Sequence, residues 1–437
     1  MKIKLLLMMV FFLALTRGGH GVEKYTLDYC IKQALENNQD IRATEYEVTS
    51  AQSKISSAKS DFLPTFEFSG NYNRLSEIPD FSITLPQGKT LNIFPSILNN
   101  YGMNLSMKQP IFTGSRLTAS YEIATNTYQA KEHNLQEVKN NVKYFIAQYF
   151  WSLVYGIESL KVVNESIELT RNHLADAKNL MASGMGSLNN VKKVEVQLSN
   201  MELMKTTIEK NIALSKSVLC KTMNLSLDTE FDPEYNLPLP EFHYNHSEIS
   251  AKAIEKRPLL RSVELGLKSS EAVKKIVRSN YFPSIFLVSN YTYARPNRRI
   301  MPQKDKWAET WDAGVSVQFT LWNWSKKRMD YQAAQNDFLK VKTEYENLQR
   351  QIELDVKRIF LDIRESLEKY HLSIKMVDQA QENYRISKDK YKNGMLLNSE
   401  LLDAEVDLLK SKLEVTKSIM DFNIKKAELK KTAGMED

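Results

Sequence analysis

An acidic cluster near the C-terminus offers the clearest possibility for chemistry in this sequence. Glu400, Asp403 and Asp407 lie at positions i, i+3 and i+7 of a helical run, so their carboxylates share one helix face. Acids in the first turn of a helix are favoured by its dipole, here beside Ser399 as the expected cap. That effect accounts for Glu400 better than for Asp407. The cluster could therefore attract cations, or it could only stabilise the start of a helix.

Other residue patterns that could indicate catalysis or metal or phosphate binding are weak. The 6 histidines are scattered, and the neighbouring His243 and His246 have no acidic or cysteine partners to complete a metal site. Gly184-Met185-Gly186 does not follow a strand, which argues against a phosphate-binding loop. No serine or cysteine nucleophile signature is present. The sequence therefore predicts a protein that is not an enzyme and that has no cofactor and no metal site.

The acidic cluster belongs to a long helical hairpin from about 325 to 432. Its outgoing arm, from Ser325 to Lys392, has no proline or glycine and would measure roughly 100 Å as a helix. The arm breaks at Asn393-Gly394-Met395, and the returning arm has a predicted coiled-coil seam at Leu402, Val406, Leu409 and Leu413. No globular core could bury so long an arm, which indicates a rod or a tunnel wall.

Four shorter segments alternate between apolar and polar residues, at about 64–75, 100–112, 283–294 and 311–322. In the first, Phe66, Phe68 and Tyr72 share one face. Segments of about ten such residues with aromatic ends are typical of transmembrane β-barrels. The alternative is an ordinary antiparallel sheet with one wet face. Four strands cannot close a membrane barrel, so a barrel would need several chains.

The sequence contains an internal duplication. At an offset of 219 residues Ala34 aligns with Ala253, and at an offset of 210 residues Gly184-Met185 aligns with Gly394-Met395. We therefore divide the chain into a first repeat at 22–224, an irregular linker at 225–247 and a second repeat at 248–437. The acidic cluster aligns with Asn190, Lys193 and Gln197 in the first repeat, so the two hairpins are not chemically equivalent.

The N-terminus has the features of a secretory signal peptide, which we place at 1–21. Lys2 and Lys4 precede an apolar run that is too short to span a bilayer. Without this segment the formal net charge falls from +6 to +3, and basic residues alternate with acids, so no nucleic-acid partner is expected. Export would permit a disulfide between Cys30 and Cys220, and two buried thiols are the alternative.

The order of these elements resembles the TolC-type outer-membrane efflux proteins. The local signatures are LENN at 35–38, QPIFTG at 109–114, YKNG at 391–394 and SELLDAEVDLL at 399–409. The resemblance implies a mainly α protomer with four β-strands and long coiled-coil hairpins. Three protomers would form a 12-stranded membrane β-barrel above a 12-helix tunnel.

The same resemblance implies a function in export. The chain would be the exit duct of a tripartite efflux or type I secretion system, in the outer membrane of a Gram-negative bacterium with a large periplasmic part. A periplasmic adaptor (membrane fusion) protein would connect the homotrimer to an RND or ABC-type inner-membrane pump. A passive porin and a periplasmic coiled-coil tether are the alternatives.

Family members close the periplasmic mouth with the second hairpin. By position, Tyr391 matches their latch tyrosine, and Glu400 and Asp403 match their acidic ring, next to which Asp407 lies. Leu396 stands where an arginine is expected, so a different latch must operate here. The hairpin tips, with Gly184 and Met185 in the first repeat and Gly394 and Met395 in the second, are the expected adaptor-docking sites.

Overall fold

The structure is a computed structural model that describes residues 23–77, 79, 81–86, 88, 90–94, 96–237, 240–243 and 245–434. The predicted signal peptide at 1–21 lies outside these ranges. The chain divides into two compact units. The first unit contains Met1–Tyr46, His133–Arg261 and Asn347–Asp437, and the second contains Glu47–Glu132 and Ser262–Glu346. Within the described ranges, no helix has both the length and the hydropathy needed to cross a membrane.

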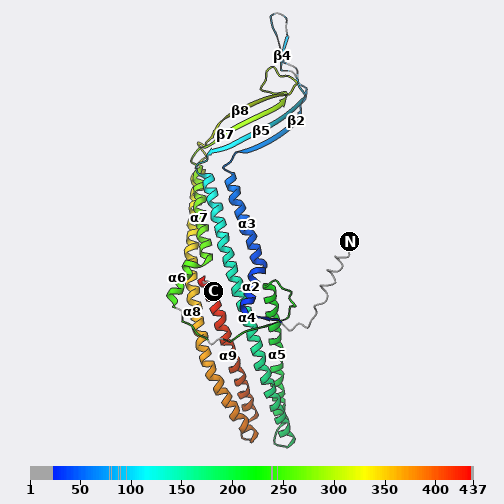
Figure 1. Cartoon of the computed structure of the whole chain (residues 1–437), viewed down its shortest axis with the longest axis vertical. Coiled ribbons are helices and arrows are strands. Elements are labelled where there is room, and N and C mark those ends of the chain that lie inside the picture. The colour runs from blue at the N-terminus through cyan, green and yellow to red at the C-terminus, as the bar shows by residue number, and fades with distance from the viewer. Residues whose placement is uncertain are drawn as a thin grey trace, which may run out of the picture. The chain divides into compact units, whose positions relative to one another are not determined.

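The second unit is built around a 4-stranded antiparallel sheet with the order β2-β5-β7-β8. Its strands are β2 (Thr65–Arg74), β5 (Asn99–Phe112), β7 (Ser284–Arg295) and β8 (Ala308–Gln318). Figure 1 shows them as a single layer. Among the described strands, β2 and β8 each have one neighbour in this sheet, so each leaves one edge free.

The strand register collects apolar side chains on one face of this sheet. Phe68 lies opposite Leu105, which lies opposite Tyr291, which in turn lies opposite Trp311. Phe68 and Trp311 are 69% and 74% exposed, although both are large and apolar. The other face is polar, and there the Thr292 hydroxyl donates to Asn104 Oδ1 at 3.0 Å. The alternation predicted from the sequence is therefore present, and the apolar face is bare in the isolated chain.

The fourth strand differs from the prediction of 311–322. It begins at Ala308 and ends at Gln318, which pairs with Ser284, the first residue of β7. Beyond that point β7 offers no backbone partner, so 319–322 leave the strand. Trp324 and Ser325 then take left-handed backbone angles, φ 52° and 66°, just before the next helix.

The longer loop of the first repeat contains a small hairpin that the sequence did not predict. It is formed by β3 (Phe81–Thr84) and β4 (Thr90–Phe94), which pair antiparallel. The corresponding loop of the second repeat is shorter by nine residues, as the change of offset from 219 to 210 requires.

The leading helical segment of each repeat is divided into two helices. In the first repeat α2 (Leu27–Asn37) is followed by α3 (Gln39–Ser60), and in the second α6 (His246–Lys256) is followed by α7 (Pro258–Ser279). Asn38 Oδ1 accepts a hydrogen bond from the Asp40 backbone N–H, at the start of the next helix, with a distance of 2.9 Å. Arg257 precedes a proline, which disfavours helical backbone. The breaks lie 219 residues apart, so the duplication includes them.

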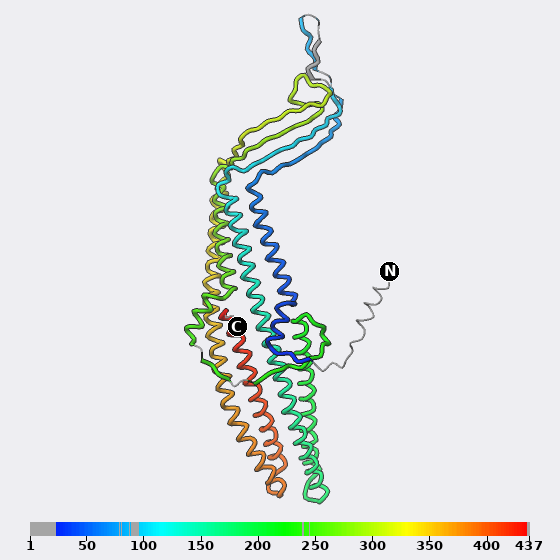
Figure 2. The backbone as a smooth tube through the Cα atoms, in the orientation of Figure 1, coloured from blue at the N-terminus to red at the C-terminus, as the bar shows by residue number. Residues whose placement is uncertain are grey.

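The first unit contains both helical hairpins. Their outgoing helices, α4 (Arg116–Ala182) and α8 (Lys326–Lys392), each have 67 residues and enter this unit from the second. The returning helices are α5 (Leu188–Thr222) and α9 (Asn398–Ala433). Figure 2 shows the two hairpins lying side by side in this unit. One apolar cluster joins them directly, and its members are Val163, Ile167, Met201 and Leu409.

A larger apolar cluster packs α2, α4 and α5 against a short sheet. That sheet consists of β1 (Glu23–Tyr25) and β6 (Phe231–Pro233), which pair in parallel. β6 therefore gives regular structure to part of the linker that was expected to be irregular. Cys30 and Cys220 belong to this cluster and are buried free thiols.

The buried stripe of α9 is displaced from the predicted seam. Leu409 is buried as predicted, whereas Leu402, Val406 and Leu413 are only partly buried. The fully buried positions around them are Leu401, Ala404, Glu405, Leu408 and Leu409. α9 packs against both α4 and α5, so its contact surface is wider than a two-helix seam. Glu405 is thereby brought inside.

Candidate functional site

The hairpin tips are tight glycine turns with the same geometry in both repeats. Gly184 and Gly394 have φ 79° and 69°, a conformation that glycine adopts without strain. The backbone N–H of Gly184 donates to Met181 O at 3.0 Å, and that of Met185 donates to Leu180 O at 2.9 Å. The second tip repeats both bonds at an offset of 210 residues. These bonds satisfy the last carbonyls of the outgoing helix, as in a Schellman turn.

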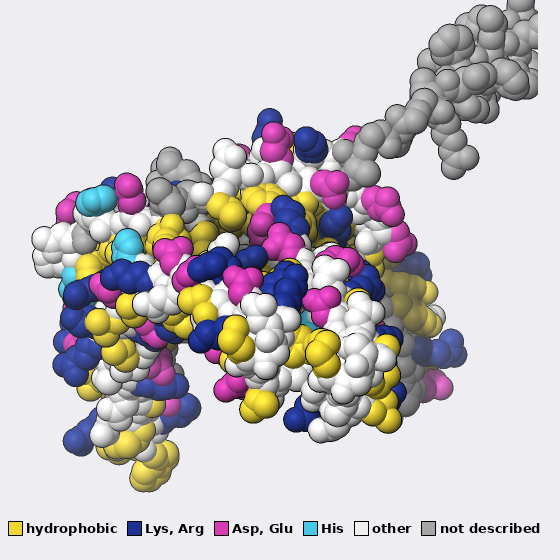
Figure 3. Space-filling view, turned by 90° about the horizontal axis from the view of Figure 1, so that it is seen from below, with side chains coloured by type: hydrophobic (Ala, Val, Ile, Leu, Met, Phe, Trp, Pro, Cys, Tyr) yellow, Lys and Arg dark blue, Asp and Glu magenta, His cyan; other side chains and the backbone are white. Residues whose placement is uncertain are grey.

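Each tip carries an exposed methionine. Met185 and Met395 are 77% and 69% exposed, beside Leu188 and Leu397, which are also exposed. Viewed from below, apolar and charged side chains alternate over the surface that faces the viewer (Figure 3). Methionine is flexible and polarizable, so such a surface can adapt to a protein partner.

The three predicted acids share the exposed face at the start of α9. Glu400, Asp403 and Asp407 are all exposed. Glu400 Oε2 accepts from the Leu397 backbone N–H at 3.0 Å, so this acid stabilises the helix start. The sequence suggested Ser399 as the cap, but the residue at the cap position of α9 is Leu397, because the helix begins at Asn398, two residues earlier than a Ser399 cap implies. No acid or base in the described part of the chain pairs with Asp403 or Asp407.

Tyr391 points into the junction between the hairpins. It is 6% exposed, and its hydroxyl donates to Asn398 Oδ1 at 3.2 Å. Its ring meets the His173 ring edge-on, with centroids 5.0 Å apart. Burial is the main reason why its pKa is raised, and the nearby carboxylates of Asp176 and Glu405 raise it further. Tyr391 is therefore a neutral hydrogen-bond donor that links the end of α8 to α9 and contacts α4.

Beside Tyr391 lies a buried histidine–glutamate pair that connects α4 to α9. His173 Nδ1 is 3.2 Å from Glu405 Oε1, and the side chains are 2% and 3% exposed. Glu405 Oε2 is 3.5 Å from the Thr170 hydroxyl, which donates to it. His173 Nε2 lies 3.0 Å from Asn398 Oδ1. His173 Nδ1 and Glu405 Oε1 are within ion-pair distance, yet neither has a satisfied hydrogen bond.

A second ion pair also joins these helices, but it is exposed. Lys412 Nζ on α9 lies 2.9 Å from Glu165 Oε2 on α4, and the two side chains are 30% and 60% exposed. Exposed pairs of this kind contribute about 0–1 kcal/mol. The His173–Glu405 contact differs because it is buried, so loss of either side chain would leave a buried polar group without its neighbour.

Sequence reasoning identified Tyr391 but missed His173, Asn398 and Glu405. His173 was taken as one of several scattered histidines. A signal was available, because Val163, Ile167, Thr170 and Ala177 repeat at helical spacing and are buried in α4, and position 173 continues that stripe. A polar residue in such a stripe needs a partner, and that requirement points to Glu405.

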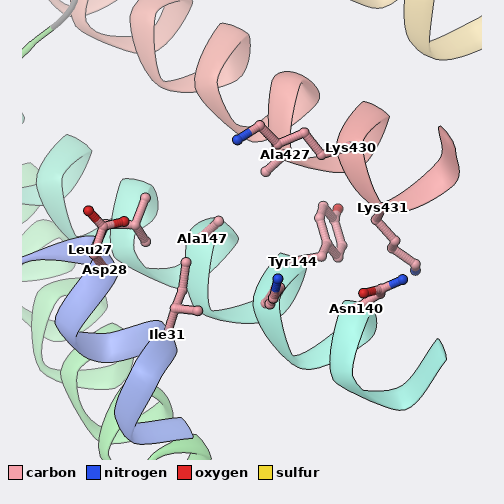
Figure 4. A pocket seen from close by; sticks show the side chains of 10 residues that line it. Leu27, Asp28, Ile31, Asn140, Tyr144, Ala147, Ala427, Lys430 and Lys431 are labelled. Carbon is pink, nitrogen blue, oxygen red and sulfur yellow. The ribbon is translucent and has the colours of Figure 1, made fainter. Parts of the chain in front are cut away.

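A small cavity of about 120 Å³ lies between α2, α4 and α9 (Figure 4). It is large enough for a group near the size of an aromatic ring. Lys431 Nζ at its rim lies 5.1 Å from the centre of the Tyr144 ring. Within the described chain, none of the residues that line it has a buried polar atom without a partner. The lining is Leu27, Asp28, Ile31, Asn140, Lys143, Tyr144, Ala147, Ala427, Lys430 and Lys431.

No group of three or more histidine, cysteine or acidic residues in the described ranges is arranged to hold a metal ion. The site that the structure assembles is therefore the junction of the hairpins, together with their tips and the acidic face of α9.

Comparison with known proteins identifies one family along most of the chain. The sequence model described as "Outer membrane efflux protein" matches residues 30–219 and again residues 249–434. The two matched segments fall in the two repeats found in the sequence.

Individual relatives are distant but extensive. The probable efflux pump outer membrane protein TtgC of Pseudomonas putida is 20% identical over 404 residues, which cover 87% of this chain and 77% of TtgC. The antibiotic efflux pump outer membrane protein ArpC of the same species has the same identity and coverage.

Solved structures of bacterial outer-membrane proteins share the fold. VceC of Vibrio cholerae superposes with a TM-score of 0.80 at 14% identity, over 94% of this chain and 97% of VceC. The CmeC outer membrane channel of Campylobacter jejuni gives 0.79 at 16% identity, over 94% of this chain and 87% of CmeC.

Proposed function

The chain belongs to the outer membrane efflux protein family, and from this premise we propose that it is the outer-membrane exit duct of a tripartite efflux or type I secretion system. Its cargo would be small molecules or polypeptides that cross the periplasm and the outer membrane of a Gram-negative bacterium. It would work as a homotrimer, with a periplasmic adaptor and an RND or ABC-type inner-membrane pump, and without enzymatic activity.

The observation that carries this proposal is the bare sheet. Its apolar face is exposed, and its outer strands β2 and β8 each have an unused edge. An exposed, unpaired edge is an aggregation hazard unless another chain covers it. Pairing of β8 from one protomer with β2 of the next would cover both edges and form a closed barrel, whose apolar face would meet lipid.

The hairpins offer a second surface for the same assembly. Exposed apolar residues recur at intervals of 7 and 11 residues on α5, at Val196, Leu203 and Leu214. The same intervals recur on α8, at Leu354, Leu361 and Leu372. Both intervals are close to whole numbers of helical turns, so each set forms one stripe. Contact between the α5 stripe of one protomer and the α8 stripe of the next would join the hairpins into a tunnel.

The periplasmic gate would use the second hairpin. In a trimer, Glu400 and Asp403 would each contribute three carboxylates around the axis, with Asp407 two turns along α9 from Glu400. Mutual repulsion of such carboxylates favours bound cations or protons. Tyr391 holds α8 and α9 together beneath them, in place of the arginine latch that Leu396 cannot provide. The tips at Gly184, Met185, Gly394 and Met395 would dock the adaptor.

The assembly can be tested by mass measurement of the detergent-extracted protein and by membrane fractionation. We expect three chains per particle, recovered with the outer membrane. A stable monomer with full β-content would overturn the proposal, and recovery in the soluble periplasmic fraction would favour the coiled-coil tether. Particles that lack helical hairpins projecting from the membrane would favour a passive porin.

A further inference from the structure

An open pocket of about 540 Å³ lies at one end of the four-stranded sheet, entirely within the second unit. It is formed where α7 leads into β7, where β8 ends, and where α4 and α8 begin (Figure 1). Its lining contains four basic side chains and one acid, namely Lys108, Arg116, Lys326, Lys327 and Asp330. The pocket therefore carries an excess of positive charge.

The strand residues that line the pocket lie on the polar face of the sheet. Lys108 is three residues from Leu105 along β5, so the two side chains point to opposite faces. Phe286 of β7 lies an even number of residues from Thr292, which bonds to Asn104 on the polar face. In the proposed barrel the polar face lines the lumen, so the pocket opens to water and not to lipid.

Two equivalent turns bring helix starts to this pocket. Gly114-Ser115 precedes α4 and Trp324-Ser325 precedes α8, and all four residues have a positive φ. A Cβ at Gly114 would lie only 2.9 Å from the Ser279 carbonyl oxygen, so this turn packs closely on the end of α7. The turns fix where the two helices begin, at Arg116 and at Lys326, and both of these residues line the pocket.

The charges at these helix starts are the reverse of what the helix dipole favours. A helix N-terminus is partially positive and is stabilised by acids, yet neither α4 nor α8 has an acid in its first turn. Asp330, further along α8, pairs with Lys326 at 2.9 Å. Within the described ranges, no acid forms an ion pair with Lys108, Arg116 or Lys327. Three basic side chains and two positive helix ends therefore surround one pocket without a matching anion.

Aromatic rings support two of these basic side chains. Lys108 Nζ lies 4.1 Å from the centre of the Phe286 ring, and Lys327 Nζ lies 4.6 Å from the centre of the Phe319 ring. Lys327 also donates to the Thr320 carbonyl oxygen at 2.5 Å. A ring attracts an ammonium group but does not neutralise it, and each ammonium has three donors, so donors remain for an anion. Phe319 is itself 46% exposed and offers apolar surface beside the charges.

We propose that this pocket binds organic anions with an aromatic or apolar body, the anionic group near Lys108, Arg116 and Lys327 and the body against Phe319. The inference rests on the proposed duct and names a class of molecule that its lumen would hold. The anion supplies the negative charge that the two helix starts lack. An inorganic anion would meet the same cations but leave the ring uncovered, so it should bind more weakly.

The test is block of the single-channel current of the full-length trimer by naphthalenesulfonate at neutral pH. Wild type should be blocked, whereas the uncharged analogue naphthalenemethanol should have little effect. Lys108→Gln with Arg116→Gln should raise the half-blocking concentration by about tenfold or more, because each hydrogen bond to a charged group contributes about a factor of ten. Phe319→Leu should weaken the block by naphthalenesulfonate but not the binding of sulfate. Lys340→Gln, an exposed change on α8 outside the pocket, is the control and should behave as wild type.

A second measurement decides the question if a variant gives no stable channels. Calorimetric titration of the detergent-extracted full-length protein reports binding of naphthalenesulfonate and of sulfate directly. Wild type and Lys340→Gln should bind naphthalenesulfonate equally, and the Lys108→Gln, Arg116→Gln double variant should bind it about tenfold or more weakly. Equal affinity of wild type and the double variant, or no binding by wild type, would overturn the site. Protein that binds the anion but forms no channel would count against the duct and not against the site.

Discussion

Single residues at the start of α9 face two different environments. Glu405 is buried, whereas Glu400 and Asp403 are exposed. The capping bond from the Leu397 N–H to Glu400 accounts for the position of that acid, but it leaves its charge available. Asp403 makes no such bond, so its role has to be tested by removing its charge.

We expect the double change Glu400→Gln and Asp403→Asn to abolish the cation selectivity of the channel and its block by multivalent cations. Glutamine can accept the same capping bond, so the helix start is preserved while both charges are removed. The measurement is the reversal potential in a planar bilayer under a salt gradient. Glu209→Gln, an exposed change on α5, is the control. Unchanged selectivity would leave the two acids as helix-dipole partners only.

The buried cysteines should be chemically silent in the folded protein. Burial is the main cause that raises the pKa of Cys30 from 9.0 to about 12, and it also raises the pKa of Cys220. The reactive thiolate is therefore scarce at neutral pH, and we expect no alkylation by iodoacetamide in the native trimer. Both cysteines should react after unfolding, as mass spectrometry can show. Labelling of native protein at neutral pH would contradict this burial.

The same shift gives a direction to alkaline stability. Above about pH 9 the unfolded chain loses thiol protons that the folded chain retains. The folded state then binds more protons, so its stability falls as the pH rises through this range. Cys30→Ala should reduce that slope in thermal unfolding between about pH 8 and 10, whereas an exposed change such as Lys210→Ala should not.

At the scale of elements, sequence periodicity predicted the long helices and the alternating strands. Contacts with neighbouring elements determined where a strand ends and which face of a helix is buried. The equal lengths of α4 and α8 and the glycine turns followed from sequence because the duplication repeats them. The end of β8 at Gln318 did not, because it depends on where β7 begins. The seam of α9 was misplaced for a similar reason. A pattern of α8 against α9 alone was assumed, but α9 also packs against α4 and α5, and the combined surface buries Glu405.

At the two tip glycines, the backbone angle can be tested separately from the space available for a side chain. A Cβ at Gly184 or Gly394 would meet no atom within 4 Å, so a side chain fits there, but the positive φ disfavours it. A left-handed backbone costs an L-residue roughly 1–2 kcal/mol. We expect Gly184→Val with Gly394→Val to distort the tips and to reduce export strongly, with trimer yield unchanged.

Gly266 in α7 supplies the matched control for this experiment. A Cβ there also meets nothing within 4 Å, but its backbone is helical. Gly266→Ala should therefore leave export intact and stabilise the helix by about 0.5–1 kcal/mol. Normal export by the double tip variant, measured as resistance to an exported compound, would argue against docking at the tips.

At the scale of the whole molecule, the two faces of the sheet differ, with apolar side chains on one face and polar side chains on the other. Leu105 and Ser106 are neighbours in β5, a central strand, and they point to opposite faces. If three sheets close into a barrel in the outer membrane, Leu105 faces lipid and Ser106 faces the lumen. If the sheet instead packs on a protein partner, the effect of a charge at either position depends on that partner and not on lipid.

We expect Leu105→Arg to block membrane assembly and Ser106→Arg to permit it. An arginine that faces lipid near the middle of the bilayer costs roughly 2–4 kcal/mol, and three protomers would each carry that cost. At position 106 the same charge would lie in water within the lumen and would change conductance instead. The measurement is the yield of heat-resistant trimer in the outer membrane, followed by conductance of the trimer recovered. Equal yields of the two variants would mean that the apolar face of this sheet does not meet lipid.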